Sequence, residues 1–265
     1  MSSPDLHIED TIPPTPGHPV VLLHGLTATH RYVVMGSRAL ERSGHRVIAY
    51  DARGHGRSAP ADAYSYELLA ADLERILDER GVDRAVLAGA SMGAHTLLRF
   101  ALDHPERAAG VVAITPAYHE HESPDLDRWD ALAEGLRSGG VEGFVAAYGD
   151  PGVPDAWRET VTTVLRQRLS AHEHPDAVAD ALQQVPRSRP FGVVTELAAL
   201  DVPAVVVADR DEVDPGHPLR VGEAYAAAIP GARLVVEEPG KSPIAWQGGQ
   251  LSKIIAGVAQ EAFGA

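Results

Sequence analysis

Short apolar runs alternate along most of the chain with segments whose apolar residues recur at helical spacing. The runs are continuous, as in strands that are buried on both faces of a parallel sheet. Strands are predicted at Leu6–Ile8 on an edge and at Val20–Leu23, Arg46–Tyr50, Ala85–Ala88, Gly110–Ile114, Ala204–Ala208 and Arg233–Val236. Helices are predicted at Tyr32–Arg42, Ser65–Arg80, Met92–Leu102, Leu219–Ile229 and Trp246–Phe263. This alternation predicts an α/β fold with a mostly parallel, doubly wound sheet.

The alternation stops between residues 116 and 190, where no run is strand-like. Prolines and glycines separate the predicted helices of this stretch, which are Asp125–Arg137, Val141–Ala147, Asp155–Leu169 and Asp176–Gln184. We therefore predict a helical insertion at 116–190 within a core domain formed by 1–115 and 191–265.

Composition narrows the possible partners. The 265 residues and 45% hydrophobic content suit one large domain with a real core. The net charge of −14 disfavours nucleic acid and anionic membranes, since both require a basic face. The polar, proline-rich residues 1–19 lack the features of a signal peptide, and the absence of cysteine excludes disulfides and a thiol nucleophile. We expect a cytoplasmic monomer or homodimer that binds a small molecule.

The segment Gly89-Ala90-Ser91-Met92-Gly93 fits the pattern G-x-S-x-G between a predicted strand and a predicted helix. A strand that turns directly into a helix needs small residues on both sides of the serine, because the two backbones nearly touch there. The turn exposes the hydroxyl of Ser91 and places the next amide at a helix N-terminus, where it can face an anion. The simpler alternative is a glycine-rich turn with a capping serine.

Together with three further segments, which occur in the order and spacing typical of the family, this motif makes the chain resemble the α/β-hydrolase superfamily. These segments are His24-Gly25, Asp51-Ala-Arg-Gly-His-Gly-Arg-Ser58 and Asp209-Arg-Asp211. The similarity is greatest to bacterial small esterases, enol-lactonases and cofactor-free haloperoxidases. It implies an α/β-hydrolase fold, a helical cap at 116–190 over the site, and no cofactor.

The resemblance also implies roles for single residues. Ser91 would be the nucleophile, and the amides of Leu26 and Met92 would form the oxyanion hole. Asp211, after a late strand, would be the acid that orients the base, in preference to its neighbours Asp209 and Asp214.

The chain departs from the family pattern at the general base. Lys241 stands where the resemblance implies a histidine, in the segment Glu238-Pro-Gly-Lys-Ser-Pro. As a base, Lys241 would need a pKa far below its reference value of about 10.4. His217 is the best placed of the 13 histidines to substitute for the missing one. Two more hypotheses are a Lys241–Asp211 salt bridge in a binder without turnover, and Lys241 as a clamp for a substrate carboxylate.

Aromatic residues of the insertion predict a mostly apolar pocket. We name His24, Tyr118, Trp129 and Trp157 as candidate substrate contacts, although His24 also suits a structural role between loops. The pairs His119-Glu-His121 and His172-Glu-His174 are interpreted as solvated, so no metal site is expected. The resulting hypothesis is a serine hydrolase acting on small hydrophobic carboxylic esters or lactones through an acyl-Ser91 intermediate. The alternatives are a small-molecule binder, or a lyase or perhydrolase on the same scaffold.

Overall fold

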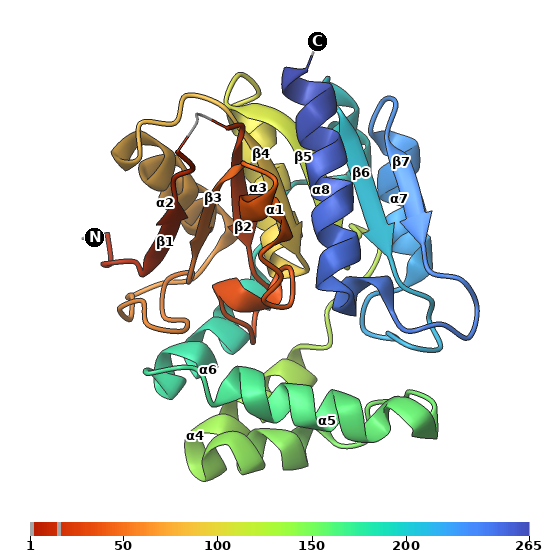
Figure 1. Cartoon of the computed structure of the whole chain (residues 1–265). Helices are drawn as coiled ribbons and strands as arrows, with labels where there is room; N and C mark the ends of the chain where they lie inside the picture. Colours follow the sequence, from red (N-terminus) through yellow and green to blue (C-terminus); the bar gives the residue numbers. More distant parts are fainter. Residues whose placement is uncertain (1–2, 15–16, 265) are drawn as a thin grey trace.

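A seven-stranded sheet forms the centre of the molecule (Figure 1). The structure is a computed structural model that describes residues 3–14 and 17–264. Residues 15–16 of the predicted proline-rich N-terminal segment lie outside this part, as do 1–2 and 265 at the ends of the predicted core domain. The strand order is β1-β3-β2-β4-β5-β6-β7. The edge strand β1 runs antiparallel to β3, and the other neighbours are parallel. The strands are β1 (Ile8–Thr11), β2 (Pro19–Leu23), β3 (Arg46–Tyr50), β4 (Ala85–Ala90), β5 (Ala108–Ile114), β6 (Ala204–Ala208) and β7 (Arg233–Val236).

Helices cover both faces of the sheet, which explains the continuous apolar runs. Along β2, Val21 and Leu23 pack with one cluster of buried side chains, while Val20 and Leu22 pack with the other. The first cluster includes residues of α2 (Tyr66–Glu79), α3 (Met92–Asp103) and α7 (Leu219–Ala228), and the second includes residues of α1 (Ala39–Arg42) and α8 (Gly248–Phe263). The predicted parallel, doubly wound architecture is confirmed.

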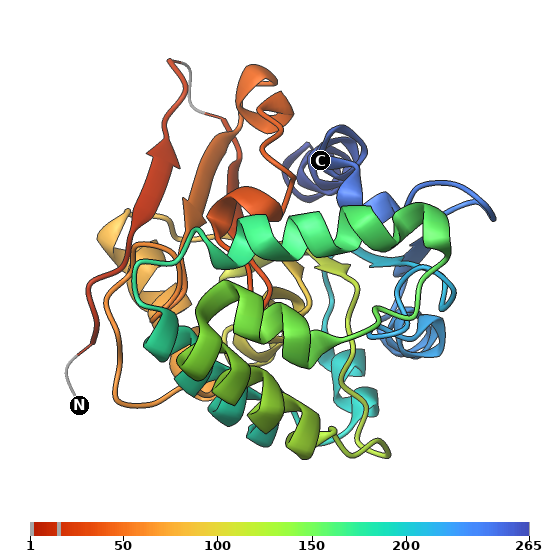
Figure 2. The same ribbon diagram turned by 90° about the horizontal axis from the view of Figure 1, so that it is seen from below.

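Three helices follow β5 and lie below the sheet in Figure 1, at the edge toward which β6 and β7 point. They are α4 (Leu126–Tyr148), α5 (Asp155–Leu169) and α6 (Pro175–Gln184). Figure 2, which views the molecule from below, shows these helices in front of the sheet. Short 3-10 turns, η2 (Val185–Arg187) and η3 (Val194–Ala199), return the chain to β6. The helices therefore cover the carboxyl ends of the strands, where α/β folds place their ligands.

Some predicted boundaries were wrong for local reasons. The predicted helix 32–42 is instead η1 (His30–Tyr32) and the short α1, because Met35 (φ 47°) and Gly36 (φ 71°) interrupt it in the left-handed region. The helices predicted on either side of Gly140 form one element with a kink at that residue (φ 58°, ψ −145°). The last predicted helix is divided into η4 (Ile244–Trp246) and α8. Among the described residues, no helix is both long and apolar enough to cross a membrane.

Candidate active site

Ser91 occupies a strained turn between β4 and α3. Its φ of 51° and ψ of −111° are unusual for a residue with a side chain, and the surrounding backbone imposes them. A Cβ on Gly93 would lie 2.1 Å from the carbonyl oxygen of Leu23, and one on Gly89 would lie 2.5 Å from the carbonyl carbon of Gly93. Only glycine fits at these two positions. The crowding holds a partly exposed Ser91 at the carboxyl edge of the sheet.

A hydrogen-bonded chain of three side chains begins at Ser91. The Ser91 Oγ lies 2.9 Å from Nε2 of His217, and Nδ1 of His217 lies 2.8 Å from Oδ2 of Asp214. A carboxylate only accepts, so Nδ1–H of His217 donates to Asp214. This tautomer leaves the lone pair of Nε2 to accept the proton of the Ser91 hydroxyl, which is the arrangement of a nucleophile, its base and an orienting acid.

The charge of Asp214 controls the protonation of His217. Burial alone lowers the pKa of His217, but the charge and the hydrogen bond of the adjacent Asp214 outweigh it, so the net pKa lies above the usual value. The positive charge of Arg168 acts in the opposite direction. The Asp214 carboxylate therefore stabilises the imidazolium that would form when the base accepts a proton.

Asp214 contacts His217, whereas Asp211, the acid favoured by sequence, does not. Oδ1 of Asp211 accepts the backbone N–H of Leu219 at 2.7 Å, which satisfies a free amide at the start of α7, and the residue is exposed. A turn closed by hydrogen bonds from the amides of Val213 and Asp214 to the carbonyl of Arg210 shapes the intervening segment. The carboxylate next to His217 therefore lies three residues further along the chain than the residue favoured from the sequence.

Two backbone amides lie next to Ser91. A Cβ on Gly25 would lie 3.6 Å from Cβ of Ser91, so the chain entering Leu26 passes close to the nucleophile. The amide of Leu26 donates no hydrogen bond within the described part of the chain. Met92 is the first residue of α3, and its N–H therefore has no partner within that helix. Neither amide has a partner among the described residues, and free donors are what an oxyanion hole requires.

Comparison with known proteins agrees with this geometry. A sequence model described as the alpha/beta hydrolase fold matches residues 18–202. The chain belongs to the α/β-hydrolase family.

Relatives of this α/β-hydrolase include the carbamate hydrolase candidate RutD of Variovorax paradoxus, 32% identical over 75% of this chain and 76% of the relative. A 2-hydroxy-6-oxononadienedioate/2-hydroxy-6-oxononatrienedioate hydrolase of Pseudomonas putida is 30% identical over 82% of this chain and 78% of that protein. Among solved structures, a thermophilic esterase from Thermogutta terrifontis superposes with a TM-score of 0.75 at 27% identity, covering 97% of this chain and 93% of the esterase. These similarities support hydrolase activity.

Lys241, where the resemblance led us to expect a histidine, lies on an exposed loop between β7 and η4. Within the described residues, no carboxylate approaches its ammonium group closely enough for an ion pair, so the hypothesised bridge to Asp211 is not formed. The side chain that contacts Ser91 in this hydrolase is His217, from the preceding βα loop.

His24 is buried between loops, and both of its ring nitrogens bond to backbone groups. Its Nδ1 donates to the carbonyl of Gly25 at 2.8 Å, and its Nε2 accepts the amide of Ala52 at 2.8 Å. Burial, with a contribution from nearby His55, lowers the pKa of His24 to about 3, so the ring is neutral as these bonds require. Both nitrogens are used, and the candidate substrate contact is corrected to a structural one.

Two of the three aromatic candidates, Tyr118 and Trp157, contact residues of the core. The hydroxyl of Tyr118 donates to the carbonyl of Gly192 at 3.2 Å, and its ring packs edge-on against Phe191. Trp129 packs against the main hydrophobic cluster. Trp157 meets Trp246 in an edge-to-face contact with ring centroids 5.8 Å apart. Among the described residues, the hydrogen bonds and ring contacts of these three side chains do not include Ser91, and their role in substrate binding stays a prediction.

A buried pair of carboxyl groups lies beside the loop of Asp214 and was missed in the sequence. Asp209 and Glu237 are 0% and 6% exposed. Burial, followed by the hydrogen bond and charge of Glu237, raises the pKa of Asp209 to about 9. Asp209 therefore keeps a proton at neutral pH that it can donate to Glu237, because two adjacent buried carboxylates repel each other. The signal available in the sequence was an acidic residue directly after each of two neighbouring strands, Asp209 after β6 and Glu237 after β7.

Metal-binding potential is limited to one group in the described residues, formed by His7, His30 and Asp51. Asp51 already accepts from the amide and Nδ1 of His30 and from the amide of Arg57. These bonds join the segment of His30 to the loop that follows β3, and we assign the group a structural role.

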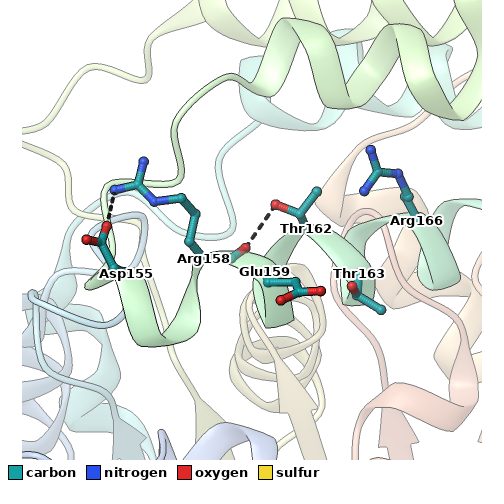
Figure 3. A pocket seen from close by; sticks show the side chains of 6 residues that line it. All are labelled: Asp155, Arg158, Glu159, Thr162, Thr163 and Arg166. Atoms are coloured by element: carbon teal, nitrogen blue, oxygen red, sulfur yellow. Dashed lines mark hydrogen bonds and ion pairs between the residues drawn. The ribbon is translucent and has the colours of Figure 1, made fainter.

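A surface hollow on α5 is separate from Ser91 and its partners (Figure 3). Its lining consists of charged and hydroxyl side chains, with an ion pair between Arg158 and Asp155 at 2.9 Å. Neither a nucleophile–base pair nor a buried donor is part of that lining, which comprises Asp155, Arg158, Glu159, Thr162, Thr163 and Arg166. We assign it no catalytic function.

Proposed function

We propose that the protein is a serine hydrolase that cleaves small carboxylic esters or lactones through an acyl-Ser91 intermediate. The observation that carries the proposal is the continuous hydrogen-bonded chain from Ser91 through His217 to Asp214. No cofactor is required, because the three side chains and two backbone amides supply every group needed for acyl transfer.

In the acylation step, Oγ of Ser91 attacks the substrate carbonyl carbon while its proton moves to Nε2 of His217. The carbonyl oxygen becomes an anion and accepts hydrogen bonds from the amides of Leu26 and Met92. Asp214 stabilises the imidazolium. When the carbon–oxygen bond to the alcohol breaks, His217 returns the proton to the leaving oxygen, and the acyl group stays on Ser91.

Deacylation repeats the sequence with water as the nucleophile. His217 accepts a proton from water, the hydroxide oxygen bonds to the acyl carbon, and Ser91 leaves with the proton that His217 returns. Atoms balance over the cycle, since one ester and one water give one acid and one alcohol. With a lactone, the alcohol and the acid remain in a single molecule.

The test combines a fluorophosphonate probe with short 4-nitrophenyl esters and four variants. Ser91→Ala should abolish labelling and turnover, and His217→Ala should lower kcat by about 10³-fold or more. Lys241→Ala should behave like the wild type, as should Lys253→Ala, which serves as the matched surface control. Retained turnover in His217→Ala together with its loss in Lys241→Ala would overturn the assignment of the base.

A binder on a hydrolase scaffold remains the second candidate from the sequence. It predicts that the wild type neither reacts with the probe nor releases 4-nitrophenol. The positions of Ser91 and His217 favour turnover, because a binding protein gains nothing from a base aligned on a strained serine.

A further inference from the structure

Arg168, near the end of α5, extends from the helical insertion toward the loop that carries Gly25 and Leu26. Its Nη2 donates to Oγ1 of Thr27 at 3.1 Å, and its guanidinium carbon lies 6.0 Å from the ring centroid of Tyr32. The side chain is partly buried. A cation of the insertion thus lies against the loop that holds one candidate oxyanion donor.

The guanidinium is also close to the nucleophile. A Cβ on Gly25 would lie 3.8 Å from Nη2 of Arg168 and 3.6 Å from Cβ of Ser91. Both groups therefore border the space beside Gly25, and the distance between Nη2 of Arg168 and Cβ of Ser91 cannot exceed the sum of these two distances. A substrate with its carbonyl at Ser91 would bring its neighbouring substituents within reach of Arg168.

The charge of Arg168 lacks a dedicated partner. Its Nε is buried without a hydrogen bond, and no carboxylate of the described residues forms an ion pair with it. Asp214 acts on it only at longer range and already binds His217. Arg53, by contrast, is buried with Nε and Nη2 both bonded to Asp72, at 2.7 and 3.0 Å. A partly buried guanidinium without such a partner is destabilising and retains donors for an incoming anion.

We propose that Arg168 forms a subsite for an anionic group and that the preferred substrates are esters or lactones carrying a free carboxylate. A carboxylate fits the planar fork of the guanidinium and can accept two parallel hydrogen bonds. The net charge of −14 repels anions in general, so a local cation is required to hold one near Ser91. This inference rests on the proposed function, and it assigns to Arg168 the clamp role considered for Lys241.

The competing explanation is a strut, in which Arg168 only joins the insertion to the core through Thr27 and Tyr32. If Arg168 has only this structural role, its removal should lower kcat/KM equally for all substrates. A carboxylate subsite predicts a loss confined to anionic substrates. The two explanations therefore predict different ratios of kcat/KM for an anionic and a neutral substrate. This ratio does not depend on how much of the protein is active.

The experiment compares mono-4-nitrophenyl adipate, which carries a free carboxylate, with its neutral methyl ester. Wild type, Arg168→Gln, Arg168→Lys and Arg166→Gln are assayed on both. Arg166 is the matched control, since it lies two residues away on α5, lines the surface hollow (Figure 3) and pairs with Glu142 of α4 at 2.7 Å. Melting temperatures of all four proteins show whether each is folded.

In Arg168→Gln we expect kcat/KM for the free acid to fall roughly 10- to 100-fold, mostly through KM. The neutral ester should change less than about threefold, and Arg168→Lys should recover part of the loss. Arg166→Gln should leave the ratio of the two substrates unchanged. An equal loss on both substrates, or a wild type that favours the methyl ester, would overturn the subsite.

Failure of the proposed function is distinguished by a binding measurement. If no protein cleaves either ester, calorimetry with adipate on the wild type and Arg168→Gln still tests the subsite. Binding by the wild type that Arg168→Gln loses would keep the anion subsite and reject the hydrolase. Equal binding, or none by either protein, would reject the subsite as well.

Discussion

Asp214 and His217 lie three residues apart in the loop that follows β6. The peptide N–H of His217 also donates to the carbonyl of Asp214, at 3.1 Å, so a single turn sets the distance between the two side chains. The proposed base and its orienting acid therefore move together. Ser91 is brought to them by an independent element, α3 with its strained first turn.

Replacing Asp214 by Asn tests this turn. Without the negative charge the pKa of His217 should fall, since that charge is what raises it. The acidic limb of the kcat/KM profile, above pH 6.5 in the wild type, should move to lower pH. The rate at the plateau should drop by about 10² to 10⁴-fold, because the tautomer is no longer fixed.

Asp211→Asn is the control for that variant. It retains an oxygen that can accept the amide of Leu219, so activity should stay within about twofold and the acidic limb should not move. A larger catalytic loss in Asp211→Asn than in Asp214→Asn would return the orienting role to Asp211.

Lys241 should be dispensable. It is exposed and His217 already contacts Ser91, so Lys241→Ala and Lys241→His should both keep kcat/KM within about twofold of the wild type. Steady-state kinetics with 4-nitrophenyl butyrate measures this. A marked rise in rate for Lys241→His would mean that a histidine at the family position can still reach Ser91.

At the scale of elements, β4 and α3 approach so closely that the sequence of the turn is nearly fully constrained. A side chain at 93 would collide with the carbonyl of Leu23 on the neighbouring strand. The strain at Ser91 is thus maintained by contact between backbones, which cannot relax by changing a rotamer.

Gly93→Ala should accordingly lower the free energy of unfolding by about 3 kcal/mol, or prevent folding. Gly257→Ala is the matched control, because a Cβ there meets nothing within 4 Å on α8 and alanine favours the helix. Urea denaturation measures both. Equal stability of Gly93→Ala and the wild type would mean that strand and helix are farther apart than described.

The Asp209–Glu237 pair joins the loop of Asp214 to the loop before α8. The amides of Arg210 and Ile244 donate to the carboxylate of Glu237, and the amide of Ala245 lies 3.4 Å from Oδ1 of Asp209. The pair therefore links the two loops, and a proton on Asp209 removes the repulsion between two adjacent carboxylates.

This pair predicts a falling stability at alkaline pH. The folded protein binds a proton on Asp209 that the unfolded chain releases near pH 4, so stability should decline as the pH rises from about 4 to about 9. Asp209→Asn cannot ionise and should flatten this decline. Thermal unfolding from pH 6 to pH 9 measures it, and equal slopes in the two proteins would contradict the shared proton.

Over the whole molecule, histidines connect the helical insertion to the core. Nδ1 of His172 accepts the amide of Gly56 at 2.7 Å, and the amide of Glu173 donates to the carbonyl of Gly56 at 2.8 Å. His95 similarly accepts the amides of Ala117 and Tyr118 where the insertion begins. These bonds require neutral rings, because a protonated nitrogen cannot accept.

Acid should therefore weaken the attachment of the insertion. Burial, with a contribution from His55, lowers the pKa of His172 to about 4, so its contribution to stability is present above about pH 6.5 and is lost as the pH falls toward 4. His172→Gln keeps an acceptor and a donor without titrating, and its melting temperature should fall less between pH 7 and pH 4.5. Exposed His121→Gln is the control, and indistinguishable curves for His172→Gln and the wild type would contradict this role.

The sequence by itself determined the architecture and the turn at Ser91. Apolar runs buried on both faces can form only a covered parallel sheet, and the glycines at 89 and 93 are needed wherever a strand and a helix meet so closely. These are local constraints, legible from neighbouring residues. The same reasoning wrongly predicted a helix over 32–42, because the spacing of apolar residues does not reveal that the backbone is left-handed at Met35.

Only the tertiary structure decided which groups meet Ser91. His217 lies 126 positions away along the chain, and a shift of a single turn selects Asp214 over Asp211. Arg168 reaches Thr27 from another helix, across 141 positions. Such contacts depend on how loops close over the sheet edge, and a difference of a few ångströms there changes a side chain's partner without altering the pattern that predicted the fold.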